Sequence, residues 1–126
     1  MIKREEIFNY LKEKYGILPD YPWKRTPNYA ILRHNNSRKW FAAVIDITED
    51  KIGLPSTKLI DAILLKNNPV LIGSLRMEKG IYAGYHMNKE HWITVHLENG
   101  IDCNRVFELI DISFNLTKND KEMNNE

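Results

Sequence analysis

The spacing of apolar residues predicts an amphipathic helix near each end of the chain. In residues 3–15 the apolar side chains recur at intervals of four, and Gly16 follows as a natural stop, with the repeating face made of Ile7, Leu11 and Tyr15. A second helix is expected from about Asp102, a suitable N-cap, with an apolar stripe of Val106, Leu109, Ile110 and Phe114. Both helices would bury one face against the rest of the fold.

Runs rich in β-branched and aromatic residues predict two pairs of strands. Residues 28–34 and 39–47 flank the turn-forming Asn35-Asn36-Ser37, which is the arrangement of an antiparallel hairpin. Residues 82–87 and 91–97 form the other pair, joined by a polar turn at Asn88-Lys89-Glu90. Within residues 91–97 a period of two predicts one strand face carrying Trp92, Thr94 and His96.

The middle of the chain is predicted to contain a third strand and two helices. The strand covers residues 51–54, and Pro55-Ser56-Thr57 opens a helix to about Lys66, with the apolar stripe Leu59, Ile60, Ile63 and Leu64. Asn68-Pro69 begins a shorter helix through about Leu75, because proline suits a first helical turn. The order α-β-β-β-α-(α)-β-β-α indicates an α+β fold, with an antiparallel sheet of about five strands packed against helices.

Length and composition suit a single packed domain. The chain has 126 residues, 43% of them hydrophobic, and the domain is expected over residues 1–118, followed by a polar tail over residues 119–126. No apolar run approaches the roughly 20 residues that span a bilayer, and the charged N-terminus lacks the apolar stretch of a secretory signal. Cys103 is the only cysteine, which excludes an intrachain disulfide and a metal site built from cysteines. We therefore expect a cytoplasmic protein without membrane association, and its oligomeric state is open.

The formal net charge of +1 conceals a separation of charge along the chain. Residues 19–45 contain five Lys and Arg against one acid, and residues 93–126 contain three against seven. Such separation can produce a basic face on a nearly neutral molecule, and only the local face matters to a polyanion. The alternative interpretation is that both segments form ordinary solvated surface.

Patterns typical of catalysis or cofactor binding are absent from the sequence. His86 and His91 lie five residues apart across a predicted turn, rather than four apart on a helix as in a helical zinc site. Cys103 lies near a predicted helix N-terminus, but no partner base stands at a recognisable spacing. The Gly-x-Ser-x-Gly, phosphate-loop and dinucleotide-binding motifs do not occur. The sequence therefore predicts no metal, no cofactor and no catalytic residues.

Cations next to aromatic residues are the remaining chemical signal. They occur at Trp23-Lys24-Arg25, Arg33-His34, Arg38-Lys39-Trp40 and Lys89-Glu90-His91-Trp92. Cations neutralise phosphates and flat rings stack on exposed bases, which favours nucleic-acid binding. The candidate phosphate contacts are Lys24, Arg25, Arg33, Arg38, Lys39 and Lys89. The alternative is that the tryptophans pack in the core and that the cations only keep a sheet edge soluble.

Several motifs resemble those of the MmcQ/YjbR family of small bacterial proteins. The resemblance runs from about Ile7 to Leu116, and its main carriers are Tyr21-Pro22-Trp23, Gly73-Ser74-Leu75-Arg76 and Tyr85-His86-Met87-Asn88-Lys89-Glu90-His91-Trp92. The resemblance implies an α+β fold related to frataxin-like and secretion-chaperone-like folds, sometimes described as a double-wing DNA-binding domain. It also implies DNA binding, although fold does not determine function. It implies no catalytic residues.

Three functional hypotheses follow. The first is a non-enzymatic DNA-binding protein that uses a basic sheet and hairpin surface. The second is a binding or adaptor protein whose pocket holds a protein segment or a small anion, with residues drawn from the family-like motifs: Lys66, Arg76, Tyr85, His86, Asn88, His91 and Trp92. The third, less favoured, is an enzyme acting at that same pocket. The motif residues could equally be structural.

Overall fold

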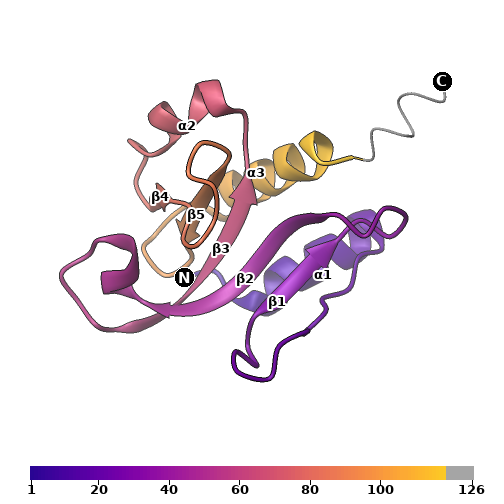
Figure 1. Ribbon diagram of the computed structural model, residues 1–126, viewed down its shortest axis with the longest axis horizontal. Helices are drawn as coiled ribbons and strands as arrows, with labels where there is room; N and C mark the ends of the chain where they lie inside the picture. Colours follow the sequence, from indigo (N-terminus) through magenta and orange to yellow (C-terminus); the bar gives the residue numbers. More distant parts are fainter. Residues whose placement is uncertain (119–126) are drawn as a thin grey trace.

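Five antiparallel strands form one open sheet in the computed structural model, which describes residues 1–118 (Figure 1). The strand order across the sheet is β1-β2-β3-β5-β4. The strands are β1 (Ala30–Arg33), β2 (Trp40–Thr48), β3 (Leu59–Lys66), β4 (Ile81–Ala83) and β5 (Trp92–His96). The helices are α1 (Arg4–Tyr15), α2 (Pro69–Leu75) and α3 (Cys103–Leu116). The predicted α+β class and the order of its elements are confirmed.

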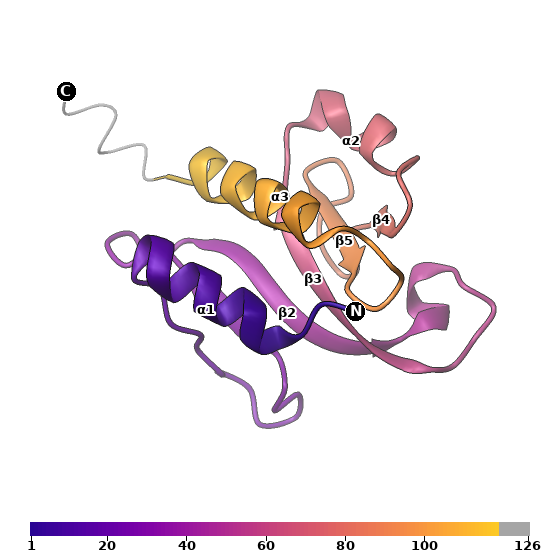
Figure 2. The same cartoon turned by 180° about the vertical axis from the view of Figure 1, so that it is seen from behind.

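Helices cover only one of the two faces of the sheet. Figure 2 shows α1 and α3 side by side across that face, while α2 lies apart from them, beside β4 and β5. Residues that alternate toward the helices, such as Val44, Ile63 and Val95, are completely buried. Residues that alternate the other way, such as Ile45, Ile60 and Leu64, are also buried, although neither α1 nor α3 covers them. We call this second surface the open face.

The third strand does not lie where the sequence pattern predicted it. Residues 59–66, expected to be helical, form β3, and residues 49–52 form a short 3₁₀ helix, η1 (Glu49–Ile52), where a strand was expected at 51–54. The helical expectation was wrong because β3 is a central strand that is apolar on both faces. Such a strand shows a continuous apolar run instead of alternation, and such a run also satisfies a helical period.

Other boundaries follow the expected local chemistry. Asn68 and Asp102 cap α2 and α3 by accepting hydrogen bonds from the N–H groups of Val70 and Asn104. Gly16 ends α1 in the left-handed conformation, with a φ of 67°. Strand β4 ends at Ala83, earlier than predicted. The polar tail expected over residues 119–126 lies outside the described residues.

Ser113 joins α3 to the two central strands. Its hydroxyl donates to the carbonyl oxygen of Phe41 and accepts a hydrogen bond of 2.9 Å from the N–H of Lys66. Phe41 is buried and Lys66 is half-buried, so their backbone groups need these hydrogen bonds. The two bonds therefore fix the position of α3 along the strands.

Asp111 joins the two covering helices. Its carboxylate accepts hydrogen bonds from the hydroxyls of Tyr10 and Tyr15, at 2.7 and 2.6 Å, and from the Lys14 ammonium at 2.9 Å. Burial raises the pKa of Asp111, but the three donors outweigh that effect and hold the pKa below its ordinary value. The rings of Tyr10 and Tyr15 also stack on Phe107 and Phe114 of α3. The polar cluster around Asp111 therefore lies at the edge of an apolar contact between α1 and α3.

Within residues 1–118, no helix is long and apolar enough to cross a membrane.

The Asp111 cluster predicts a pH-dependent contribution to stability. We expect Asp111→Asn to lower the free energy of unfolding at pH 7 by about 1–3 kcal/mol, because charged hydrogen bonds to three donors are weakened. The lowered pKa makes this stabilisation fully present above the unfolded pKa of about 3.9, and it is lost as the pH falls below that value. The difference in the free energy of unfolding between wild type and variant, measured with urea, should therefore shrink as the pH falls through the lowered pKa of Asp111.

Glu108→Gln is the matched control, because Glu108 lies on the same helix and makes only an exposed contact of 3.7 Å with Arg105. It should change the free energy of unfolding by less than about 0.5 kcal/mol. Equal effects of the two substitutions would contradict the assigned role of Asp111.

Candidate functional site

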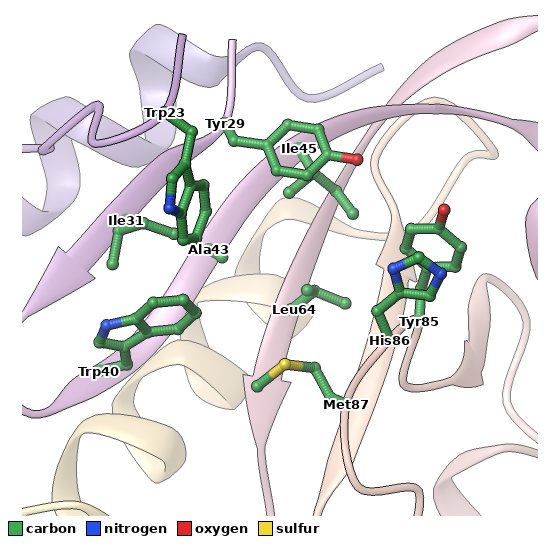
Figure 3. Close-up of a pocket in the computed structure, with 10 residues that line it drawn as sticks. All are labelled: Trp23, Tyr29, Ile31, Trp40, Ala43, Ile45, Leu64, Tyr85, His86 and Met87. Atoms are coloured by element: carbon green, nitrogen blue, oxygen red, sulfur yellow. The ribbon is translucent and has the colours of Figure 1, made fainter. Parts of the chain in front are cut away.

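A cavity of about 210 Å³ lies on the open face of the sheet. Its floor is aliphatic and comes from β1, β2 and β3, with the side chains Ile31, Ala43, Ile45 and Leu64. Figure 3 shows Trp23 and Trp40 on one side of this floor, with Tyr85 and His86 on the opposite side. Tyr29 and Met87 complete the lining. We call this space the aromatic cavity.

A β-bulge turns Trp40 into the aromatic cavity. Leu32 pairs with Ala42, but Arg33 pairs with Trp40, so Phe41 is an extra residue in β2. Phe41 and Ala42 consequently both belong to the helix-covered core. Without the bulge, strict alternation would place Trp40 beneath the helices together with Ala42.

The loop before β1 supplies the second tryptophan. Asp20 and Ile31 exchange two backbone hydrogen bonds, of 2.9 and 2.7 Å, which anchor this loop to the sheet edge. The ring of Trp23 then lies 5.6 Å from that of Trp40, at an interplanar angle of 60°. Trp23 remains 41% exposed, so its ring is accessible to a ligand.

The turn after β4 builds the opposite wall. The backbone N–H of Tyr85 donates to the Thr94 hydroxyl at 2.9 Å, and this hydroxyl donates to the carbonyl oxygen of Ala83. His86 follows in the left-handed conformation, with a φ of 57°, and its ring stacks on Tyr85 at 3.9 Å between centroids. A non-glycine residue rarely adopts this φ, although histidine tolerates it better than most residues.

A second cavity, of about 300 Å³, adjoins the aromatic cavity. The two share Tyr85 and His86, and the second also contains Lys51 and Lys89. The stacked ring pair therefore stands between an apolar space and a space bordered by cations.

The candidate phosphate contacts divide into two groups. Lys24, Arg25, Arg38 and Lys39 are exposed, and none of them forms a salt bridge within residues 1–118. Arg33 is already engaged, because it contacts Asp20 at 3.3 Å and lies over the Trp40 ring.

Lys89 is engaged as well. Its ammonium donates to the carbonyl oxygen of Gly84 at 3.2 Å, inside its own turn.

The family-like motif residues do not converge on one pocket. Tyr85 and His86 line both cavities, and Trp92 packs beneath the turn against Gly84, directly opposite Lys66 of β3. Trp92, Thr94 and His96 share one face of β5, as the period of two predicted, and that face is the open face rather than the helix-covered one. Three other motif residues lie elsewhere: Arg76 ends α2, Asn88 accepts from the Glu90 N–H, and the His91 carbonyl accepts from Asn67.

Sequence reasoning did not assign Trp23, Tyr29, Trp40 and Met87 to a pocket. The sequence does contain a signal for Tyr29. It lies two residues before Ile31, so alternation along a strand places the two side chains on the same face. For Trp40 the alternation pointed to the wrong face, since the bulge is not visible in the pattern.

The remaining titratable candidates have structural partners. Buried His96 donates from Nε2 to Glu49 at 2.8 Å and accepts the Glu98 N–H at Nδ1, which ties η1 to β5. Burial and the nearby carboxylates of Glu6 and Asp102 raise the pKa of the Cys103 thiol, which disfavours the reactive thiolate. No group of three or more metal-ligating His, Cys, Asp or Glu side chains gathers within residues 1–118.

The chain matches the YjbR family model over residues 12–116. It is 45% identical to the YyaQ protein of Bacillus subtilis over 118 residues, which cover 94% of this chain and all of that protein. It is 33% identical to the YjbR protein of Escherichia coli over 54 residues, or 42% of this chain and 46% of that one.

Solved structures share this fold. A Pseudomonas syringae protein, 45% identical, superposes with a TM-score of 0.90 over 93% of this chain and all of that one. A Deinococcus radiodurans protein, 24% identical, shares the fold with a TM-score of 0.67 over 89% of this chain and 75% of that one.

The close contact between Gly84 and Trp92 predicts an intolerant position. A Cβ added at Gly84 would lie 2.8 Å from both the Cβ and the carbonyl oxygen of Trp92. We expect Gly84→Ala to lower the free energy of unfolding by about 1–3 kcal/mol, because the turn must move away from β5. Gly73→Ala is the control, since its new methyl group meets no atom within 4 Å and lies in α2. Urea unfolding of both variants tests this, and a stable Gly84→Ala protein would refute the assigned packing.

Proposed function

The chain belongs to the YjbR family, and we propose that it is a non-enzymatic nucleic-acid-binding protein that uses the open face of its sheet. The observation that carries the proposal is the position of the four exposed cations. Lys24 and Arg25 directly follow Trp23, and Arg38 and Lys39 directly precede Trp40. Because the two tryptophan rings lie 5.6 Å apart and both line the aromatic cavity, each cation pair is joined along the chain to the same side of that cavity.

The hairpin tip supports a phosphate-binding role. Arg38 has a φ of 63°, which turns the chain sharply in the hairpin tip between β1 and β2, and this residue is exposed. Cations on such a tip reach phosphates without first breaking a salt bridge, and neutralising phosphates is the main source of affinity for nucleic acids. Contacts of this kind position the protein but do not read sequence.

The competing functions find less support. A small anion requires convergent donors, but Arg76 stands apart and the aromatic cavity is lined mainly by apolar groups. Acid–base catalysis requires paired titratable groups, but the polar atoms of the lining belong to His86, two tyrosines and two indoles, with no carboxylate among them. A stacking surface bordered by cations fits nucleic acid best.

The proposal predicts that the hairpin tip contributes affinity without specificity. Changing Arg38 and Lys39 together to Ala should weaken binding to unrelated 20-residue DNA strands equally. It should also reduce the slope of log K against log salt by about two units on duplex DNA, one for each lost phosphate contact. Fluorescence anisotropy at several salt concentrations measures both quantities, and the melting temperature should stay nearly constant.

The charge-matched control changes Lys3 and Lys12 together to Ala. Both residues are exposed and belong to α1 or its N-cap, on the side of the sheet away from the open face. It should leave the affinity and the salt slope unchanged. If the Arg38/Lys39 variant binds like wild type, the hairpin tip is not part of the nucleic-acid interface. Loss of binding to one sequence only would contradict its non-specific character.

A further inference from the structure

We infer that the aromatic cavity takes one unpaired nucleobase, so that the ligand is single-stranded rather than duplex nucleic acid. This inference rests on the proposed function and specifies its substrate class. It is carried by the shape of the aromatic cavity, by the charges at its two ends and by the accessibility of its rings.

The lining matches the faces of a flat ring system. Two indoles and two tyrosine rings surround an aliphatic floor, and the volume of about 210 Å³ is below the roughly 300–1,000 Å³ of pockets for drug-sized ligands. Stacking on aromatic side chains tolerates every base, because each base has a π-face. A site built in this way binds single strands with little sequence preference.

Cations stand at both ends of the aromatic cavity. Lys24, Arg25, Arg38 and Lys39 are sequence neighbours of the two tryptophans at one end, and Lys51 borders the neighbouring cavity beyond Tyr85 and His86. A base inserted between them would leave its 5′ and 3′ phosphates directed toward opposite ends, where each meets positive charge.

The same charges argue against a cationic guest. An aromatic cage also suits methylated lysine or another quaternary ammonium group. Here, however, the Arg33 guanidinium already lies 5.5 Å from the centroid of the Trp40 ring, and the surrounding lysines and arginines would repel a second cation. The ligand that complements this site is therefore flat, apolar on its faces and negatively charged at its edges.

The ring pair Tyr85–His86 offers a further stacking surface at the rim. His86 is exposed and its backbone is held in the left-handed region, with its ring nearly parallel to that of Tyr85 at 16°. In a duplex, bases are paired and stacked on each other, so reaching these surfaces would require unstacking. A single strand presents its bases without that cost.

The test compares three probes on the wild-type protein: a dT12 strand, a 12-residue abasic strand with the same phosphates, and a 12-bp duplex. At one salt concentration, dT12 should bind about 5- to 150-fold more tightly than the abasic strand, the range that stacking of a base on an aromatic side chain supplies. It should also bind more tightly than the duplex and quench tryptophan fluorescence. This comparison needs no substitution, so it does not depend on a variant folding.

Trp23→Ala should lose most of the preference for dT12 over the abasic strand while keeping the salt slope, and Trp23→Phe should restore part of it. Tyr21→Ala is the matched control, because Tyr21 is a 50% exposed aromatic residue of the same loop that does not line the aromatic cavity. It should bind like wild type.

The outcomes separate the two proposals. If all three probes bind with a steep salt dependence but equal affinity, and Trp23→Ala changes nothing, the base-binding inference is refuted while the proposed function stands. Tighter binding to duplex than to dT12 also refutes the inference alone. If no probe binds in a salt-dependent manner, the proposed function is refuted, and the base-binding inference with it.

Discussion

The central constraint on this molecule is a sheet that is apolar on both faces but covered by helices on only one. β2 and β3 bury side chains in both directions, yet α1 and α3 cover a single face and are held there by Ser113 and Asp111. Loops and turns must therefore shield the other face, and they do so with large aromatic rings. Rings that shield incompletely leave a cavity, and an accessible apolar surface of this kind is typical of an interaction site.

The open face also explains why the cations differ in their roles. Arg33 lies on the sheet and is neutralised by Asp20, and Lys89 stabilises the turn that it belongs to. The cations of the loop and the hairpin tip are exposed, and no carboxylate of residues 1–118 forms a salt bridge with them. Charge that stabilises the fold is thus separated from charge that is available to a ligand, although Arg33 and the four exposed cations occur in the same basic segment, residues 19–45.

Local signals predicted much of this fold, and long-range packing decided the rest. The terminal helices and the first hairpin were predictable because capping residues, a four-residue period and a polar turn act within a few residues. β3 was not, because burial on both faces removes the alternation that identifies a strand. The aromatic cavity was only partly predictable: the cations beside Trp23 and Trp40 are visible in the sequence, but the bulge at Phe41 that turns Trp40 outward is not.

The most direct test of the account is to map, by NMR, which backbone amides and indole N–H groups shift when a short single strand is titrated into the protein. The account predicts that the shifts concentrate in residues 21–29, 38–45 and 84–89, and that they include the indoles of Trp23 and Trp40. The chemical shifts of the α1 and α3 amides should not change, because these helices lie on the opposite face of the sheet. Shifts concentrated on α1 and α3, with both indoles unaffected, would contradict the claim that the open face is the binding surface.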